Sequence, residues 1–482
     1  MAEISQGQIE EIVAQVVRNL QREGQIPPTP SGTLPVRARV NPSHSPQSGV
    51  YPTVDEAVAA AKEAQAEFVK LGLAKRKGVI EAIRQACREN AKRLAEIAVK
   101  DTKMGNAEHK FTKNEGAADL SPGVEDLQSE AVSGDMGTLL VEYVPYGVIN
   151  SITPTTNPTS TVINHAIIML SAGNAIVFSP HPNAEECTRE TMQVINEAII
   201  KAGGPANLLT AVSNATLRTA KEIMNHPDVG MLVATGGGSV IKAALSSGKK
   251  AIAAGPGNPP AIIDETANVK KAAKDVIDGT SFDNNLLCIG EKALFVVESV
   301  ANETIRELVN NGGYLVDASE LKNLENVVSK NGDMNHDYIG KDATVILDAA
   351  GIRAPANTTA VVVEVSADHT FVVDEFLMPI LPVVRVSDFD EALKGAVAAD
   401  GGREHTGMLH TNNTERITQF MKAADWSVAV VNAPSYACAG LGGEGFLAMT
   451  IAGPTGEGFT RPHTFTRQRR LTIAGGLSTH TL

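Results

Sequence analysis

The sequence lacks the features that would indicate several large classes of protein. No apolar run approaches the roughly 18 residues that a membrane-spanning helix needs, and aromatic residues make up only 4% of the chain. Positive charge is also scarce, because 42 Lys and Arg face 55 Asp and Glu, which leaves a formal net charge of −13. Such a chain suits neither the phosphates nor the bases of nucleic acid. We therefore expect no membrane span and no nucleic-acid partner.

Cysteine is sparse as well. The 482 residues include four cysteines, none of which forms a Cys-x-x-Cys pair: Cys87, Cys187, Cys288 and Cys438. Four irregularly spaced cysteines in so long a chain make neither a disulfide framework nor a zinc site, so we expect no metal. This usage favours a reducing cytoplasm, and residues 1–5 lack the basic-then-apolar order of a secretory signal.

The first 49 residues differ in character from the rest. Residues 5–22 carry an apolar stripe at helical spacing, which predicts an amphipathic helix: Ile9, Ile12, Val13, Val16 and Leu20. Residues 23–49 are rich in Pro, Ser and Gly, as linkers are. A helix on such a tether must bury its stripe elsewhere. Three alternatives are a site on its own domain or oligomer, the surface of another protein, and membrane or organelle targeting, which its acidic residues disfavour.

From Thr53 onward the chain alternates between helix and strand patterns. Thr53 and Glu56 have the capping-box spacing ahead of an Ala-rich helix, and a second long helix is predicted from about Ala74 to Lys100. Apolar runs such as "NAIVFSP" and "MLVAT" are each followed by a helical pattern. A run of alternating polarity over residues 138–152 predicts a strand or hairpin. The overall alternation is typical of α/β domains with largely parallel sheets.

Four loops follow predicted strands and carry chemistry. They are the hydroxyl-rich 153–161, the segment 179–182 that begins Ser-Pro-His-Pro, the glycine run 236–239 and the Gly-Pro-Gly-Asn stretch 255–258. The carboxyl ends of parallel strands are where ligands bind. None of the loops is a Gly-x-Gly-x-x-Gly or Walker motif. The triple glycine opens a predicted helix, whose N–H groups can face a phosphate, although glycine clusters at strand ends are often plain turns.

Cys288 lies in "FDNNLLCIGEK", just before an apolar strand. A free cysteine is commonly a small buried hydrophobe. The order of the surrounding motifs, however, resembles that of the aldehyde dehydrogenase superfamily, specifically the CoA-acylating propionaldehyde and acetaldehyde dehydrogenases of bacterial microcompartments. The resemblance covers roughly residues 50–475 and rests on these motifs: "TPTTNPTST", "SAGNAIVFSPHP", "ATGGGSVIKAA", "AAGPGNPPAIID", "FDNNLLCIGEK", "DEFLMPILPVVRV", "EHTGMLHT" and "TIAGPTGEG".

The resemblance implies that Cys288 attacks an aldehyde and that the resulting thiohemiacetal is oxidised to an acyl thioester, which CoA then releases. It also implies that the oxyanion is bound by the backbone N–H of Cys288 and by an asparagine side chain. Asn157 is our candidate because an amide is the better donor, although a gapless match places Thr156 at that position. Hydrolytic relatives carry a catalytic glutamate where this chain has residues 254–257, "AGPG". Without that base, hydrolysis should be slow and CoA is favoured as the acceptor.

By the same resemblance, a set of loop residues forms the site for NAD: Thr153, Pro154, Ser179, Pro180, Thr235, Gly236, Gly237, Gly255 and Glu375. Glu375 matches a glutamate that contacts the nicotinamide ribose, although it could also be a solvated side chain. Ser179 replaces a lysine near the adenosine ribose, which favours NAD without excluding NADP. We assign no acid–base role to His165, His181 or His405, and we expect His165 to be a core residue.

The resemblance further implies a three-part architecture. A Rossmann-type cofactor domain is expected over residues 50–255 and an α/β catalytic domain over 256–463. A small oligomerisation element combines a hairpin at 134–148 with the segment 464–482, so we expect a homodimer or homotetramer. Residues 1–22 resemble an encapsulation peptide that binds a shell protein, which places the enzyme inside a microcompartment of the bacterial cytoplasm. The alternatives are a hydrolytic aldehyde dehydrogenase and a catalytically inactive, shell-interacting scaffold.

Overall fold

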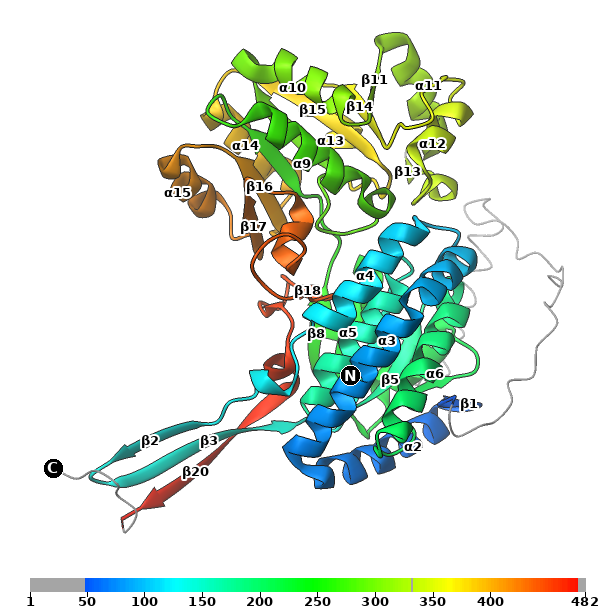
Figure 1. Cartoon of the computed structure of the whole chain (residues 1–482), viewed down its shortest axis with the longest axis vertical. Coiled ribbons are helices and arrows are strands. Elements are labelled where there is room, and N and C mark those ends of the chain that lie inside the picture. Colours follow the sequence, from blue (N-terminus) through cyan, green and yellow to red (C-terminus); the bar gives the residue numbers. More distant parts are fainter. Residues whose placement is uncertain (1–47, 331–332, 476–482) are drawn as a thin grey trace, which may run out of the picture. The chain divides into compact units, whose positions relative to one another are not determined.

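The computed structural model describes residues 48–330 and 333–475 (Figure 1). The predicted helix 1–22 and nearly all of the linker 23–49 lie outside the described residues, as does the end of the 464–482 segment. The described chain contains two parallel sheets, each covered by helices, and one three-stranded antiparallel sheet. Within this part of the chain no helix is both long and apolar enough to cross a bilayer.

The first sheet has six parallel strands in the order β1-β6-β5-β4-β7-β8. Their bounds are β1 Val50–Tyr51, β4 Val148–Thr153, β5 Ala175–Pro180, β6 Leu209–Val212, β7 Val229–Thr235 and β8 Lys250–Ala254. Strands β4 and β5 are buried along their whole length, as expected for strands with helices on both faces. The strand order reverses between β4 and β7, which makes a topological switch point at their carboxyl ends.

Seven helices accompany this sheet: α2 Val54–Phe68, α3 Gly72–Thr102, α4 Ala107–Leu120, α5 Pro158–Ser171, α6 Glu185–Lys201, α7 Leu217–Asn225 and α8 Gly238–Leu245. The predicted capping box is present, because Thr53 and Glu56 exchange hydrogen bonds at the start of α2. The long helix α3 packs against α4, α5 and α6 (Figure 1). Helix α5 is buried along its whole length.

The second sheet has seven parallel strands in the order β11-β14-β15-β10-β9-β16-β17. Their bounds are β9 Pro260–Ile263, β10 Ala293–Val297, β11 Gly313–Val316, β14 Ala360–Glu364, β15 Ile380–Val386, β16 Thr406–His410 and β17 Val428–Val431. The helices are α9 Val269–Ser281, α10 Glu298–Asn310, α11 Ala318–Val328, α12 Ala343–Ala349, α13 Thr370–Val373, α14 Phe389–Asp400 and α15 Thr414–Ala423. The predicted α/β fold with parallel sheets is confirmed.

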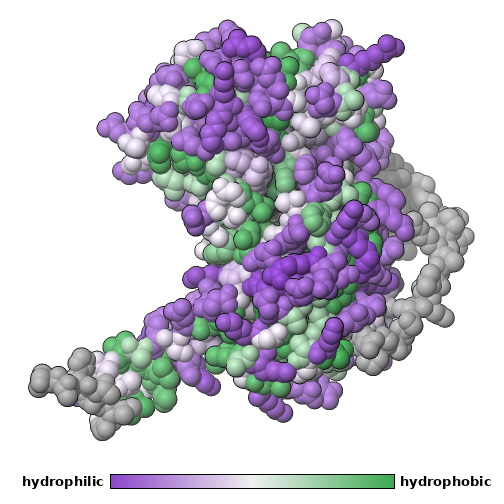
Figure 2. All heavy atoms as spheres, viewed as in Figure 1, coloured by the Kyte–Doolittle hydropathy of each residue, from purple (hydrophilic) through white to green (hydrophobic). Residues whose placement is uncertain are grey.

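The antiparallel sheet joins β2 Glu130–Gly134, β3 Gly137–Pro145 and the C-terminal β20 Thr466–Ala474. Thr466 pairs with Pro145 and Ala474 with Gly137. The run 138–152 is therefore not one hairpin: Gly147, with φ of 106°, separates β3 from β4, which belongs to the first parallel sheet. Figure 2 shows apolar side chains on the antiparallel sheet, and several of them are exposed: Val132, Met136, Leu471 and Ile473.

The remaining strands are the short pairs β12 Ser329–Lys330 with β13 Asp333–Met334, and β18 Ile451–Ala452 with β19 Gly458–Phe459. Single 3₁₀ turns are η1 Val69–Leu71, η2 Val124–Asp126, η3 Pro182–Ala184, η4 Phe282–Asn285, η5 His336–Tyr338, η6 Ser435–Ala439 and η7 Pro462–Phe465. One stretch departs from the expected domain bounds. Leu447 and Ala452 pack in the core of the first sheet, whereas Ala437 and Ile451 pack in that of the second, so this end of the expected 256–463 domain is shared between the two cores. Phe465, in the expected 464–482 segment, also packs in the first core.

Candidate active site

Cys288 follows a turn with an unusual backbone. Asp283, Asn284 and Asn285, all within η4, have φ of 50°, 56° and 61°. Asp and Asn adopt this left-handed region more readily than other non-glycine residues, which explains the "DNN" run in the sequence. Three such residues in succession are strained and persist only where the surroundings hold them.

Side-chain contacts hold the turn in this conformation. Asn284 Nδ2 donates to the carbonyl of Gly340 at 2.9 Å and to Asp342 Oδ1 at 2.8 Å. Lys292 Nζ donates to the carbonyl of Asn285 at 2.6 Å and to its Oδ1 at 2.7 Å. The loop that presents the partly exposed Cys288 is thus fixed at its start by neighbouring segments.

The environment of Cys288 opposes ionisation of its thiol. Burial, reinforced by the charge of Glu375, raises the pKa of Cys288 to about 12, while Lys292 and Lys113 act in the opposite direction. Burial also lowers the pKa of Lys292 to about 8. The thiol is therefore protonated at neutral pH before a ligand binds, and a nucleophilic attack requires a group that accepts its proton.

His405 is a neutral base next to this loop. A β-carbon built on Gly257 would lie 2.6 Å from the carbonyl oxygen of Cys288 and 3.0 Å from Cγ of His405, so Gly257 separates the two. His405 Nδ1 shares a hydrogen bond of 2.8 Å with the hydroxyl of Thr406. Its Nε2 is buried and has no hydrogen-bond partner in the described part of the chain. Burial lowers the pKa of His405 to about 4, and the sequence alone had assigned this residue no role.

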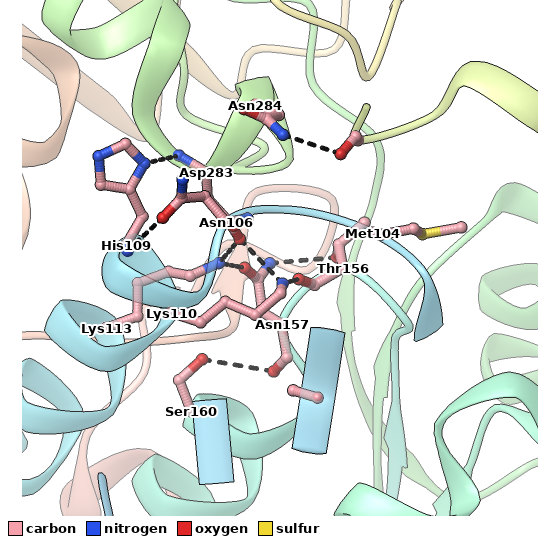
Figure 3. A network of polar contacts seen from close by, with 12 residues as sticks. Met104, Asn106, His109, Lys110, Lys113, Thr156, Asn157, Ser160, Asp283 and Asn284 are labelled. Carbon is pink, nitrogen blue, oxygen red and sulfur yellow. Dashed lines mark hydrogen bonds and ion pairs between the residues drawn. The ribbon is translucent and has the colours of Figure 1, made fainter. Parts of the chain in front are cut away.

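Asn157 lies directly before helix α5 and is almost fully buried. Its Oδ1 accepts a hydrogen bond of 2.6 Å from Lys113 Nζ, and its Nδ2 donates to the Thr156 hydroxyl at 3.1 Å (Figure 3). An amide nitrogen has two N–H donors, so one remains available to an oxyanion. The Thr156 hydroxyl already accepts a bond from Asn157.

Sequence reasoning missed a buried ionic cluster beside Asn157. Lys110 and Lys113 of helix α4 both form ion pairs with Oδ2 of Asp283, and all three side chains are at most 3% exposed (Figure 3). The backbone N–H of Asp283 donates to His109 Nδ1 at 2.9 Å. The only trace in the sequence is two lysines three residues apart, a spacing that places them on one helix face.

The predicted cofactor residues of the first sheet lie along one edge. Thr153 pairs with Pro180 across β4 and β5, and Thr235 pairs with Ala254 across β7 and β8. Because these four strands are adjacent, the loops that follow them share the carboxyl edge at the switch point. Pro154, Ser179, Gly236, Gly237 and Gly255 belong to the same strand ends and loops.

This edge has the properties that a dinucleotide site requires. The hydroxyl of Thr153 is buried and has no hydrogen-bond partner within the described residues. Gly236, Gly237 and Gly238 have open space where a side chain would be, and they lead into the N-terminus of α8, where N–H groups suit a phosphate. The Ser179 hydroxyl accepts a bond of 2.9 Å from Asn150 Nδ2. These residues fit NAD.

Glu375 reaches the site from the second parallel sheet, after helix α13. Burial raises the pKa of its carboxyl, while Lys292 and the backbone N–H of Gly257 act in the opposite direction. Its charge acts on Cys288, so it belongs to the nucleophile's surroundings rather than to a solvated surface. Glu375 and the carbonyl of Cys288 thus both lie at Gly257.

The other two histidines lie in different settings. His165 is fully buried; its Nδ1 bonds to the hydroxyl of Ser151 at 2.8 Å and its Nε2 to that of Thr450 at 2.7 Å. The Thr450 hydroxyl in turn lies 2.8 Å from that of Thr235. His165 is therefore a satisfied core residue, as predicted. His181 is exposed, and its Nδ1 accepts a bond of 3.1 Å from the Asn183 N–H.

The sequence and the fold are both similar to those of known proteins. The chain matches the model of the aldehyde dehydrogenase family over residues 40–445. It is 43% identical over 434 residues to the acetaldehyde dehydrogenase (acetylating) EutE of Salmonella typhimurium, a match covering 89% of this chain and 92% of that protein. A propionaldehyde dehydrogenase from the Clostridium phytofermentans fucose utilisation bacterial microcompartment aligns with a TM-score of 0.89 and 43% identity, covering 90% of this chain and 100% of the other. A Rhodopseudomonas palustris propionaldehyde dehydrogenase, solved with bound CoA and an acylated cysteine, aligns with a TM-score of 0.88 and 41% identity, again covering 90% and 100%.

Proposed function

This chain belongs to the aldehyde dehydrogenase family, and we propose that it oxidises a short-chain aldehyde to acyl-CoA with reduction of NAD. Propionaldehyde is the first candidate substrate and acetaldehyde the second. The observation that carries the proposal is a partly exposed cysteine, Cys288, on a tightly held loop. The stretch 254–257, where hydrolytic relatives have their base, contains no carboxylate.

In the first step, the thiolate of Cys288 attacks the aldehyde carbon and the carbonyl oxygen becomes an oxyanion. The free N–H of the Asn157 amide and the backbone N–H of Cys288 bind that oxygen. His405, neutral and with an unpaired Nε2, accepts the thiol proton. The neutral ring of His405 and the carbonyl of Cys288 both lie close to Gly257, and a histidine near a protonated thiol can serve as its general base, which supports this assignment.

NAD bound at the edge of the first sheet would supply the hydride acceptor, so that the thiohemiacetal on Cys288 is oxidised to an acyl thioester. The dinucleotide would be held at the edge of the first sheet by the residues predicted for it: Thr153, Pro154, Ser179, Pro180, Thr235, Gly236, Gly237 and Gly255. Glu375 would contact its nicotinamide ribose. Steady-state KM values for NAD and NADP test the preference for NAD, and a lower KM for NADP would contradict it.

CoA then attacks the thioester and leaves as acyl-CoA. Water is a poor nucleophile without a general base, whereas a CoA thiol ionises within reach of neutral pH. The Rhodopseudomonas palustris relative with CoA and an acylated cysteine supports this order of events.

The decisive experiment measures NADH formation from C2 to C4 aldehydes with and without CoA, in the wild type and in Cys288→Ala. We expect NADH and acyl-CoA in equal amounts, dependence on CoA, and no activity in the variant. Free acid equal to NADH without CoA would indicate the hydrolytic alternative. Activity unchanged by Cys288→Ala, with an effect only on deleting residues 1–22, would indicate the scaffold.

We also propose that the enzyme acts inside a microcompartment of the bacterial cytoplasm and that residues 1–22 bind its shell. A reporter fused to residues 1–22 should gather at shells in compartment-forming cells, and a diffuse reporter would contradict this. The apolar side chains on β2, β3 and β20 support a homodimer or homotetramer. Leu471→Asp should lower the mass measured by light scattering if this sheet forms the contact.

A further inference from the structure

We propose that Lys113 is a positioning residue, which ties the amide of Asn157 to the loop of Cys288 and thereby aims the oxyanion donor. This inference rests on the proposed function, which makes Asn157 that donor. The contacts that support it are drawn in Figure 3. Lys113 lies on α4, outside every motif that the sequence singled out.

The first contact determines the orientation of the amide. Lys113 Nζ lies 2.6 Å from Asn157 Oδ1, and an ammonium group can only donate. The oxygen of the amide must therefore face Lys113, and Nδ2 must face away from it. Lys113 is 3% exposed, so water does not compete for this bond. Without Lys113, both orientations of the amide become available.

The second contact joins the same ammonium to the nucleophile's loop. Lys113 Nζ forms an ion pair with Oδ2 of Asp283, the first of the three left-handed residues before Cys288. The other carboxylate oxygen of Asp283 accepts a bond of 2.7 Å from the backbone N–H of Asn106. The ammonium group of Lys113 therefore contacts both the Asn157 side chain and the turn that leads to Cys288, and it fixes their relative positions.

Lys110 is a natural comparison within the same cluster. It has the same charge, is equally buried and pairs with the same Asp283 oxygen at 2.9 Å. Its remaining contact is the backbone carbonyl of Thr156 at 2.9 Å, rather than the Asn157 side chain. If the cluster only stabilises the fold, the two lysines should be equivalent. If Lys113 aims the amide, they should differ in catalysis.

The cluster also holds more positive than negative charge. Two ammonium groups share one carboxylate, and burying an ammonium without its own counter-charge is costly. Burial lowers the pKa of Lys113 to about 7, with Lys110 acting in the same direction and Asp283 against it. With this pKa, Lys113 is protonated in about half of the molecules at pH 7, and an oxyanion bound at Asn157 would favour its protonated form.

The test uses Lys113→Met and Lys110→Met, which remove the same charge while keeping most of the apolar volume. The probe is p-nitrophenyl acetate: the Cys288 thiol gives its proton to His405, its sulfur bonds to the acetyl carbon, the ester carbon–oxygen bond breaks, and p-nitrophenolate leaves with the electron pair. This acylation passes through the same kind of oxyanion and needs neither NAD nor CoA. Its single-turnover rate therefore reports on the oxyanion step without hydride transfer or CoA attack, and comparison with Asn157→Ala isolates the part that depends on the amide.

We expect Lys113→Met to slow acylation by roughly 10- to 100-fold and Lys110→Met by about threefold at most, since an aimed donor is worth up to ~1,000-fold. Both variants should lower the melting temperature to a similar extent. In an Asn157→Ala background, Lys113→Met should have almost no further effect, because the amide it aims is gone. Equal slowing by both lysine variants, or slowing by Lys113→Met that is independent of Asn157, would overturn the proposal.

Two outcomes separate this inference from the proposed function. If acylation depends on Lys113 and Asn157 as expected but aldehyde and CoA yield no NADH, the proposed function fails and the positioning role stands. If Asn157→Ala leaves the acylation rate unchanged, Asn157 is not the donor and the positioning role falls. If Lys113→Met does not fold, Lys113→Gln is measured instead. Its amide keeps an N–H donor for Asn157 Oδ1, so acylation should be faster than in Asn157→Ala, and a rate as slow as that of Asn157→Ala would overturn the proposal.

Discussion

Replacing Gly257 with alanine is a direct perturbation of the loop beside Cys288. A β-carbon at Gly257 would lie 2.6 Å from the carbonyl oxygen of Cys288 and 3.0 Å from Cγ of His405. Carbon–oxygen contacts relax to about 3.3 Å, so one side must move by about 0.7 Å. The neighbours are backbone and a buried ring, and neither can swing away as the end of a flexible side chain can.

The size of the expected effect follows from this displacement. Overpacking of this kind costs about 1–3 kcal/mol of stability. A reacting atom misplaced by about 1 Å costs up to ~100-fold in rate, and a shift of about 0.7 Å at Cys288 should cost about 10- to 100-fold. We therefore expect Gly257→Ala to lower kcat by that factor and the melting temperature by a few degrees.

The assay measures kcat for NADH formation at saturating aldehyde, CoA and NAD, together with the melting temperature. Gly255→Ala is the comparison for folding, because its β-carbon would contact Ile241 and Pro454 at an ordinary 3.7 Å. That variant should melt at the wild-type temperature. Wild-type kcat and melting temperature in Gly257→Ala would refute the close approach of this loop to Cys288.

Three further predictions follow from burial. Because the pKa of Cys288 is raised to about 12, its alkylation by iodoacetamide should accelerate about tenfold per pH unit between pH 7 and 9; a plateau below pH 8 would contradict this. Burial raises the pKa of Glu291 from 4.5 to about 7, so its contribution to stability is complete below pH 4.5 and is lost as pH rises through 7. In urea unfolding, the free energy of unfolding of Glu291→Gln should exceed that of the wild type by ~2–3 kcal/mol at pH 8 and equal it at pH 4. Equal free energies of unfolding for the two proteins at both pH values would contradict this prediction. Thr153→Val removes a buried hydroxyl without a described partner, so it should not lower the melting temperature and should raise the KM for NAD several-fold; an unchanged KM would remove Thr153 from the site.

Much of the fold could be predicted because its signals are local. Strand and helix patterns depend on residues near one another in sequence, and the capping box at Thr53 and Glu56 needs only four residues. The common edge of the cofactor loops also follows, since parallel strands end on the same side of a sheet. The end of the hairpin could not be predicted, because alternating polarity continues past Gly147 although the chain there enters another sheet.

The ionic cluster could not be predicted in the same way. Lys113 and Asp283 are 170 residues apart, and lysines on a helix are usually solvated. The packing of Leu447 and Phe465 in the core of the first sheet, although they follow the second sheet in sequence, depends equally on contacts between distant segments. His405 was passed over because its unpaired Nε2 is visible only once its neighbours are in place.

By itself, the sequence determined the class of fold, the family, Cys288 as the candidate nucleophile and the loops expected to meet the cofactor, because motif order and periodicity are written along the chain. Only the tertiary structure decided how the loop of Cys288 is held, which atom of the Asn157 amide bonds to Lys113, and that the buried Nε2 of His405 has no described hydrogen-bond partner. These depend on burial and on contacts between distant segments. Burial sets the charge of a side chain and the strength of its bonds, and folding alone determines burial.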